Sequence, residues 1–199
     1  CTDASAGYYV SISAATSQTA CSLGTYQPYT AQSSCIDADA GYYVGSTAAT
    51  AQTACAAGTY NPDTASTSSS ACITTAAGHY SGSGAASQTE CALGTYQDST
   101  GQSSCLDADL NYYVDSTAAT SQTACPAGTY TAATGSTSSS DCVSTQPGYY
   151  STPGSSPTPC AVGTYQPLAG QSTCLNATPG HYVSITAATA QTACAAGTY

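Results

Sequence analysis

The sequence of 199 residues contains no Lys, Arg, Met, Trp or Phe, and only 5% of its residues are charged. Nothing offsets the ten acidic residues, so the formal net charge is −10. Proteins bind nucleic acid through Lys and Arg contacts to phosphates, so a nucleic-acid partner is excluded on composition. An anionic membrane surface would repel the chain for the same reason. No apolar run approaches the roughly 18 residues of a membrane span, so we expect no membrane insertion in this window.

Large apolar side chains are also scarce, because the aromatic residues are 17 Tyr and the bulk of the chain is small. Such a chain cannot build a thick core, and its units must be held by local links and by stacking on their neighbours. Catalytic patterns are missing as well. The phosphate-binding loop needs a Lys, and no Gly-x-Ser-x-Gly elbow has credible His and Asp partners. We therefore predict that the chain is not an enzyme and needs no cofactor.

The sequence does contain one short box, Cys-x-x-Gly-Thr-Tyr. It begins at Cys21, Cys55, Cys91, Cys125, Cys160 and Cys194. Between these copies lies a version that keeps Gly-x-Tyr but has Ala or Thr in place of the Cys. Counting both versions, the register falls at Gly7, Gly24, Gly41, Gly58, Gly78, Gly94, Asn111, Gly128, Gly148, Gly163, Gly180 and Gly197, mostly 17 residues apart. The chain is thus about twelve copies of one half-repeat.

Twelve Cys among small polar residues favour an oxidising compartment, and we expect an extracellular or cell-surface location. Structural zinc sites use Cys-x-x-Cys or Cys/His clusters, and no two Cys here lie that close, so no metal site is expected. The sequence starts in mid-repeat at Cys1 without a signal peptide. This start predicts that it is a window from a longer protein.

The Cys-x-x-Gly-Thr-Tyr box, followed by about a dozen Gly/Ser/Thr-rich residues and a further Cys, resembles the ephrin-receptor-like cysteine-rich repeat. That repeat is similar in outline to tumour-necrosis-factor-receptor modules. It also occurs in mastigoneme-type and other large microbial surface glycoproteins. The resemblance covers the whole chain, and it implies an extracellular module held by disulfides.

The chain departs from this family in a regular way. The family's second motif, Cys-x-x-Cys, would add a Cys at six further positions, which here are Ala4, Ala38, Thr75, Ala108, Thr145 and Ala177. The partners that those Cys would have are Gln18, Gln52, Gln88, Gln122, Pro157 and Gln191. Both ends of every second bridge are missing together. Bridged and unbridged half-repeats therefore alternate and are predicted to share one backbone shape.

That logic favours the pairs Cys21–Cys35, Cys55–Cys72, Cys91–Cys105, Cys125–Cys142 and Cys160–Cys174. Cys1 and Cys194 would then pair outside this window or with a neighbouring subunit. The competing scheme joins 1–21, 35–55, 72–91, 105–125, 142–160 and 174–194, and the sequence alone leaves it open.

The predicted fold is all-β, with short strands, much coil and no helix, because Gly, Thr, Ser and Pro interrupt the chain every few residues. We expect one hairpin per half-repeat, stacked into an elongated, disulfide-stapled rod. Its repeated Gly would supply a positive φ or a close backbone approach. The longer period divides the continuous array into 1–20, a partial unbridged repeat, 21–90 and 91–159, two full blocks, and 160–199, the start of a third.

The Tyr of each Gly-x-Tyr sits at one place in every half-repeat. The structural interpretation is a stacking ladder, each ring covering the Gly or disulfide of the next unit. The alternative is an exposed carbohydrate- or partner-binding stripe. The ladder would comprise Tyr9, Tyr26, Tyr43, Tyr60, Tyr80, Tyr96, Tyr113, Tyr130, Tyr150, Tyr165, Tyr182 and Tyr199. His79 and His181 replace the first Tyr of Gly-Tyr-Tyr, and we interpret both as structural.

Paired carboxylates at Asp37/Asp39 and Asp107/Asp109 are spaced so that they could share a Ca²⁺. The equivalent segments 73–75 and 143–145 have no carboxylate, however. A solvated acidic face is therefore preferred, and Ca²⁺ is not expected.

Ser and Thr are the feature with functional content. Asn176-Ala177-Thr178 is an N-glycosylation sequon, at Asn176. Recurring loop Thr are candidates for O-glycosylation: Thr47, Thr50, Thr67, Thr117, Thr120, Thr137, Thr186 and Thr189. The alternative is plain solvated Ser and Thr. Glycans would solubilise a thin repeat array and cover its edges.

Taken together, the sequence predicts an extracellular structural protein, a repeat-built subunit of a glycosylated fibril or cell-surface appendage. Its partners would be further copies of itself in a filament, and its own glycans. The alternative is a spacer or stalk in an adhesin or receptor ectodomain.

Overall fold

The computed structural model describes residues 1–197 and confirms an all-β chain built from repeated stapled units. The secondary structure is a series of two-residue strands and two single turns of 3-10 helix, with no α-helix among the described residues. The strands are β1 (Tyr8–Tyr9), β2 (Thr19–Ala20), β3 (Thr25–Tyr26), β4 (Ile36–Asp37), β5 (Tyr42–Tyr43), β6 (Thr53–Ala54), β7 (Thr59–Tyr60), β8 (Ile73–Thr74), β9 (His79–Tyr80), β10 (Thr89–Glu90), β11 (Thr95–Tyr96), β12 (Leu106–Asp107), β13 (Tyr112–Tyr113), β14 (Thr123–Ala124), β15 (Thr129–Tyr130), β16 (Val143–Ser144), β17 (Tyr149–Tyr150), β18 (Thr158–Pro159), β19 (Thr164–Tyr165), β20 (Leu175–Asn176), β21 (His181–Tyr182) and β22 (Thr192–Ala193). The 3-10 turns are η1 (Ser69–Ala71) and η2 (Ser139–Asp141).

Each half-repeat from β1–β2 to β21–β22 forms one antiparallel hairpin, as the sequence predicts. The first strand carries the Tyr of Gly-x-Tyr, and the second strand lies just before the next box. In the pair of β3 and β4, for example, Tyr26 lies opposite Ile36. In the pair of β5 and β6, Tyr43 lies opposite Thr53. The shared register means that bridged and unbridged half-repeats have the same local backbone.

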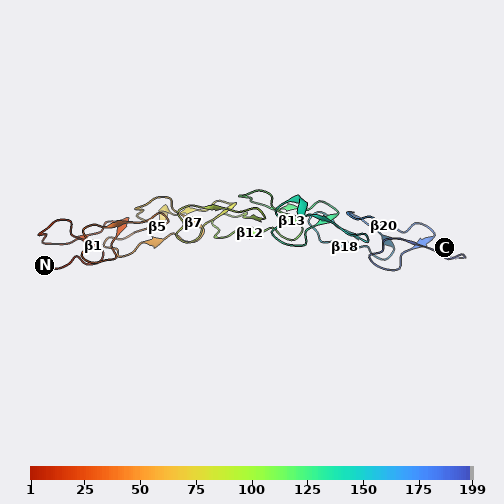
Figure 1. Cartoon of the computed structure of the whole chain (residues 1–199), viewed down its shortest axis with the longest axis horizontal. Coiled ribbons are helices and arrows are strands. Elements are labelled where there is room, and N and C mark those ends of the chain that lie inside the picture. Colours follow the sequence, from red (N-terminus) through yellow and green to blue (C-terminus); the bar gives the residue numbers. More distant parts are fainter. Residues whose placement is uncertain (198–199) are drawn as a thin grey trace. The chain divides into compact units, whose positions relative to one another are not determined.

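The contacts divide the chain into two compact units. Unit 1 comprises Cys1–Cys91 and Gln97–Cys105, and unit 2 comprises Ala92–Tyr96 and Leu106–Tyr199. Within unit 1, β1, β5 and β7 follow one another in chain order, and within unit 2, β13, β18 and β20 do the same (Figure 1). Sequence neighbours are therefore also neighbours in space inside each unit, which is typical of a repeat array.

The core of each unit is a line of small side chains rather than a cluster of large ones. The residue three positions before the box Gly is almost completely buried in both kinds of half-repeat, whether Cys, Ala or Thr. Its members include Ala4, Cys21, Ala38, Cys55, Thr75, Cys91, Ala108, Cys125, Thr145 and Cys160. A second buried line is formed by the residue three positions after the box Gly, such as Val44 and Val114. The first line holds only Cys, Ala and Thr, and the second also holds Gln27, Asn61, Gln97 and Gln166, so neither line contains a Phe, Trp, Met or Leu.

Backbone hydrogen bonds join each half-repeat to the next. Gly24 donates its N–H to Val44 O at 2.9 Å and accepts from Ala38 N at 2.8 Å. Val44 in turn donates to Ser66 O at 2.9 Å. In unit 2, Gly94 bonds to Val114 and Ala108 in the same way. The box Gly and the residue three positions after it are thus the two backbone stations through which successive hairpins are connected.

Candidate functional site

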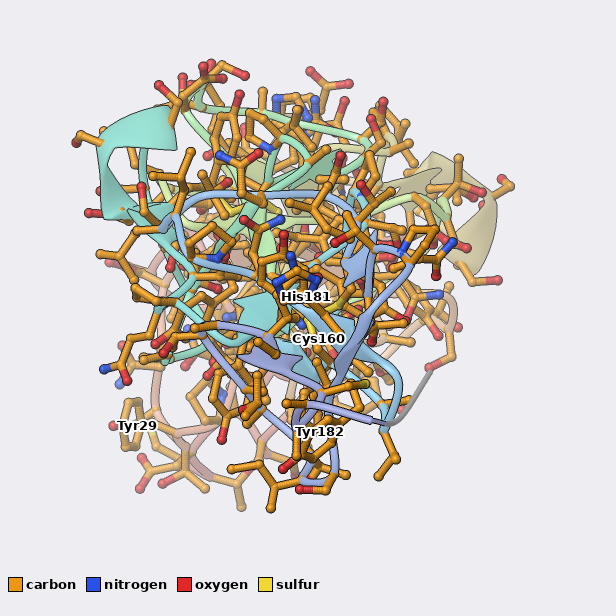
Figure 2. All side chains as sticks on the ribbon, turned by 90° about the vertical axis from the view of Figure 1, so that its right-hand side faces the viewer. Tyr29, Cys160, His181 and Tyr182 are labelled. Atoms are coloured by element: carbon orange, nitrogen blue, oxygen red, sulfur yellow. A yellow bond between two sulfur atoms is a disulfide. The ribbon has the colours of Figure 1, made fainter. Side chains whose placement is uncertain are left out.

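The five disulfides are the covalent element of the repeat. The structure joins Cys21–Cys35, Cys55–Cys72, Cys91–Cys105, Cys125–Cys142 and Cys160–Cys174, which is the first of the two pairing schemes. In every bridge the Cα atoms are 5.7 Å apart, and the sequence separation is 14 or 17 residues. The first Cys of each bridge is fully buried and the second is half-buried (Cys160 is labelled in Figure 2). Each bridge therefore ties a buried core position to the far end of the same hairpin.

Cys1 and Cys194 are the two free thiols of the described residues; Cys1 is exposed and Cys194 is half-buried. Their positions in the repeat differ. Cys1 lies six residues before Gly7, where the second Cys of a bridge stands, and Cys194 lies three residues before Gly197, where the first stands. Pairing of either thiol with another chain or with a further segment stays a prediction.

Unbridged half-repeats have a closure of their own, formed by a glutamine side chain. Gln122 Oε1 accepts the Asp109 N–H at 2.7 Å, and Gln122 Nε2 donates to Asp109 Oδ2 at 2.6 Å. Gln52 makes the same two bonds to Asp39, at 2.7 and 2.8 Å. We call this arrangement the glutamine clasp. The pairs are Gln18 with Ser5, Gln52 with Asp39, Gln88 with Ala76, Gln122 with Asp109, and Gln191 with Thr178.

The clasp lies where a disulfide would lie in a bridged half-repeat. Each Gln occupies the position of the second Cys, and its backbone partner directly follows the position of the first. One unbridged half-repeat lacks the clasp, because Pro157 stands in place of the Gln and has no amide to offer. Sequence reasoning noted these Gln only as missing Cys. Their recurrence in register was the signal that could have revealed a substitute closure.

Two of the unbridged half-repeats also bury a hydroxyl without a hydrogen-bond partner. Thr75 and Thr145 replace Ala at the buried position, and both Oγ1 atoms are unpaired. A buried hydroxyl that loses its water without gaining a hydrogen-bond partner lowers the free energy of unfolding by on the order of 1–3 kcal/mol. These are the two half-repeats that follow the 17-residue bridges.

The box Gly is covered by backbone, not by a tyrosine ring. A Cβ placed on Gly24 would lie 2.2 Å from Ala65 O, and one on Gly128 would lie 2.1 Å from Gly170 O. Both glycines have φ of +81°, a conformation that L side chains rarely adopt. Asn111 takes the same conformation at φ +70° and donates its N–H to the Thr131 hydroxyl at 2.7 Å. The expected positive φ and close approach are therefore both present, with a carbonyl as the cover.

The covering residue belongs to a loop two half-repeats further along the chain. Ala65, at φ +53°, also donates its N–H to Ala38 O at 2.7 Å. One loop residue therefore bonds to the preceding half-repeat and closes over the box Gly of the one before that. Gly101 and Gly135 have the same role toward Gly58 and Gly94. The same geometry, repeated with Ala or Gly, explains why the contacts reach over three consecutive half-repeats.

The ladder tyrosines are half-buried from Tyr9 to Tyr165, and Tyr182 is 49% exposed. Tyr199 lies outside the described residues. In each bridged hairpin an exposed aliphatic residue lies across from the Tyr, and in each unbridged hairpin a Thr does. Stacking of the Tyr rings on disulfides stays a prediction. Outside the ladder, Tyr29 projects outward from the ribbon in Figure 2 and is 67% exposed.

The candidate glycosylation residues all face solvent. Thr47, Thr50, Thr67, Thr117, Thr120, Thr137, Thr186 and Thr189 are exposed. Asn176 is exposed at the end of β20, opposite Thr164. Thr178 of the same sequon is held in a glutamine clasp, with Gln191 Nε2 donating to its Oγ1 at 2.9 Å. Accessibility therefore permits modification at every candidate.

The ionisable side chains do not converge. His79 and His181 lie on separate hairpins, where each Nδ1 is within hydrogen-bond distance of a nearby backbone carbonyl. Asp39 and Asp109 belong to clasps, whereas Asp37 and Asp107 lie on β4 and β12. Among the described residues there is no group of three His, Cys, Asp or Glu side chains that could hold a metal ion.

No helix in the described part of the chain has the length and apolar character needed to cross a bilayer. The five disulfides indicate an oxidising compartment and fit a secreted or extracellular protein.

Comparison with known proteins gives one family. The model of the family described as tyrosine-protein kinase ephrin type A/B receptor-like matches residues 78–125 and 148–194. No curated protein matches the chain. Each matched segment begins in an unbridged half-repeat and contains one complete disulfide, Cys91–Cys105 in the first and Cys160–Cys174 in the second. The segments end at Cys125 and Cys194, which occupy the same position of the repeat. Residues 78–125 and 148–194 are therefore similar to ephrin-receptor-like cysteine-rich repeats.

Proposed function

We propose that the chain is a structural repeat segment of an extracellular protein, a subunit of a glycosylated fibril or cell-surface appendage. The observation that carries the proposal is the repeated backbone connection between half-repeats. Because the box glycines from Gly7 to Gly163 present the same backbone station to the next half-repeat, with Asn111 as the exception, an array of this kind can be lengthened with the same contacts. Stiffness and length would then be the product of the fold, and no single residue would carry the function.

The charge of the chain supports a specific expectation about assembly. With ten acidic residues and no Lys or Arg, copies packed side by side repel one another. Added salt shortens the Debye length from about 10 Å at 0.1 M to about 3 Å at 1 M and so weakens that repulsion. We therefore expect lateral association to increase with ionic strength. A partner with Lys-rich or Arg-rich surfaces would show the opposite salt dependence.

Electron microscopy of negatively stained native material tests the fibril. Filaments that contain the chain, identified by an antibody against it, are the expected result. Isolated single molecules at both low and high salt would refute the proposal. Mass spectrometry of the same material reports glycans. An Asn176→Gln variant controls for the N-linked chain, because it removes the acceptor while leaving the Thr178 clasp in place.

A second candidate is a spacer in an adhesin or receptor, with a binding module in another part of the protein. It is favoured by the family match, since the family is named for receptors. Material that is recovered only as single molecules attached to cells would support the spacer over the fibril.

A further inference from the structure

The alternation of two closures has a mechanical consequence. We propose that the array is an extensible tether, in which the unbridged half-repeats open one at a time under tension while the bridged half-repeats stay closed. The inference rests on the proposed structural role only for the source of the tension. The opening order itself follows from the closures within each hairpin.

The residues enclosed by a disulfide in each bridged half-repeat cannot extend under tension. Between the two Cys of a bridge the path is fixed at a Cα–Cα distance of 5.7 Å, however long the loop. Three bridges enclose 14 residues and two enclose 17. About 76 residues are thus withheld, which corresponds to roughly 240 Å of extended chain after the bridge spans are subtracted.

The unbridged half-repeats have the same loop but only hydrogen bonds to close it. The Gln122 clasp consists of two bonds at 2.6 and 2.7 Å, on residues that water can reach. Water competes directly for such bonds, so a clasp opens at a much lower force than a covalent bridge. Once it opens, the chain between Ala108 and Gln122 is free to lengthen.

Opening can proceed in steps because the contacts are short in range. The loop around Ala65 bonds to Ala38 and closes over Gly24, two half-repeats back. The loop around Gly135 bonds to Ala108 and closes over Gly94 in the same manner. Opening one half-repeat therefore disturbs only the one or two half-repeats on either side of it, and stability is a sum of local terms.

The half-repeat at 145–159 is expected to open first. Pro157 replaces the clasp Gln, so no side-chain amide joins the two ends of this loop. Thr145 at its buried position has an unpaired hydroxyl. Hydrogen bonds between Thr152 and Ser155 order the tip of this loop, but they do not join its two ends. It is the weakest closure among the described half-repeats.

Single-molecule force spectroscopy on the oxidised full chain tests the order. Several separate extension events are expected, the first from residues 145–157. A Pro157→Gln variant supplies the missing amide opposite the Gln146 N–H and should raise the force of the lowest event without changing the number of events. Pro157→Ala is the matched control, because it removes the ring without adding an amide. One all-or-none event for the whole oxidised chain would overturn the proposal.

Two further variants locate an event in a named half-repeat. Gln122→Ala should lower the force of one event and leave the total extension unchanged. The double variant Ala108→Cys/Gln122→Cys, oxidised, should shorten the total extension by about 40 Å, since it encloses 14 residues. An unchanged extension in the bridged double variant would show that this half-repeat does not open. Reduction of the native chain should add about 240 Å, and a much smaller gain would mean that the bridged loops were already extended.

Amide hydrogen exchange gives a second readout without force. Backbone amides of unbridged loops should exchange faster than those of bridged loops, and the 145–157 loop fastest of all. Equal rates in both kinds of half-repeat would overturn the proposal. Neither measurement depends on filament formation, so failure of the tether and failure of the fibril are separate results.

Discussion

A sixth disulfide placed in an unbridged half-repeat is the sharpest test of the shared backbone shape. Ala108 is fully buried, like the first Cys of a bridge, and Gln122 is half-buried, like the second. Ala108 N bonds to Gly94 O at 2.8 Å, and Cys91 N bonds to Gly78 O at 2.9 Å. Replacing both residues with Cys should therefore give a bridge that forms spontaneously on oxidation and leaves the native five unchanged.

The expected gain follows from the loop that the new bridge closes. A separation of 14 residues is worth about 3 kcal/mol on the chain-entropy model. Against this stands the loss of the Gln122 clasp, whose solvent-exposed bonds contribute about 1 kcal/mol. The net stabilisation should be about 2 kcal/mol.

Because repeat arrays need not unfold as one unit, the gain is best measured locally. A gain of about 2 kcal/mol should slow hydrogen exchange of the 108–122 amides by a factor of about 30. The single variant Ala108→Cys is the control, since it carries the thiol without the partner. Two findings would each show that the unbridged half-repeats do not share the bridged geometry. One is failure of the double variant to oxidise, and the other is scrambling with Cys125 or Cys142.

Three further predictions concern the free energy of unfolding, each with a matched residue in the chain. Thr75→Val removes an unpaired buried hydroxyl and should stabilise its half-repeat by about 1 kcal/mol, whereas Thr74→Val on the exposed strand should not. Ala71→Asp should stabilise η1 by about 0.5–1 kcal/mol, because Asp141 at the equivalent position of η2 completes a capping box with Ser138. Hydrogen exchange of the 68–72 amides measures this stabilisation. If their exchange does not become slower, the carboxylate does not have this role. Alanine at three glycines should give a graded series by chemical denaturation. Gly82→Ala should be nearly neutral, Gly135→Ala should lose about 1 kcal/mol to its φ of +72°, and Gly128→Ala should lose more, since its Cβ would also meet Gly170 O.

Much of this fold could be predicted from the period alone. The positions of Cys21 and Cys35 within the period favour one disulfide scheme, because bridged and unbridged loops then have the same length. The positive φ of the box Gly follows from its constancy and from Asn111 as its substitute. Hairpins follow from Tyr-rich segments separated by turn residues. Each of these features depends on residues within a single half-repeat, which sequence patterns can reveal.

The clasp and the cover could not be predicted in the same way. The recurring Gln marks where a clasp could form, but Gln122 accepts from the backbone N–H of Asp109, which every residue has, so the partner in that bond leaves no trace in the sequence. The carbonyl of Ala65 closes over Gly24, 41 residues away, and a carbonyl also carries no sequence signal. Contacts between a side chain and the backbone within a hairpin, or between the backbones of two hairpins, become visible only in the folded structure.

The covering position shows why Ala and Gly alternate freely along the array. Ala14, Ala31, Ala48, Ala65, Ala118 and Ala187 occupy it at positive φ, as do Gly84, Gly101, Gly135, Gly154 and Gly170. In the folded state Ala costs about 1–2 kcal/mol there, because its Cβ is crowded in the left-handed region. In the unfolded state Gly has more conformational freedom to lose, about 0.4–1 kcal/mol. The two effects oppose each other and leave Ala a net cost of about 1 kcal/mol, and the bonds at this position come only from the backbone. The array can therefore accept either residue at the cover, whereas the covered box position has no room for a Cβ on most of its glycines.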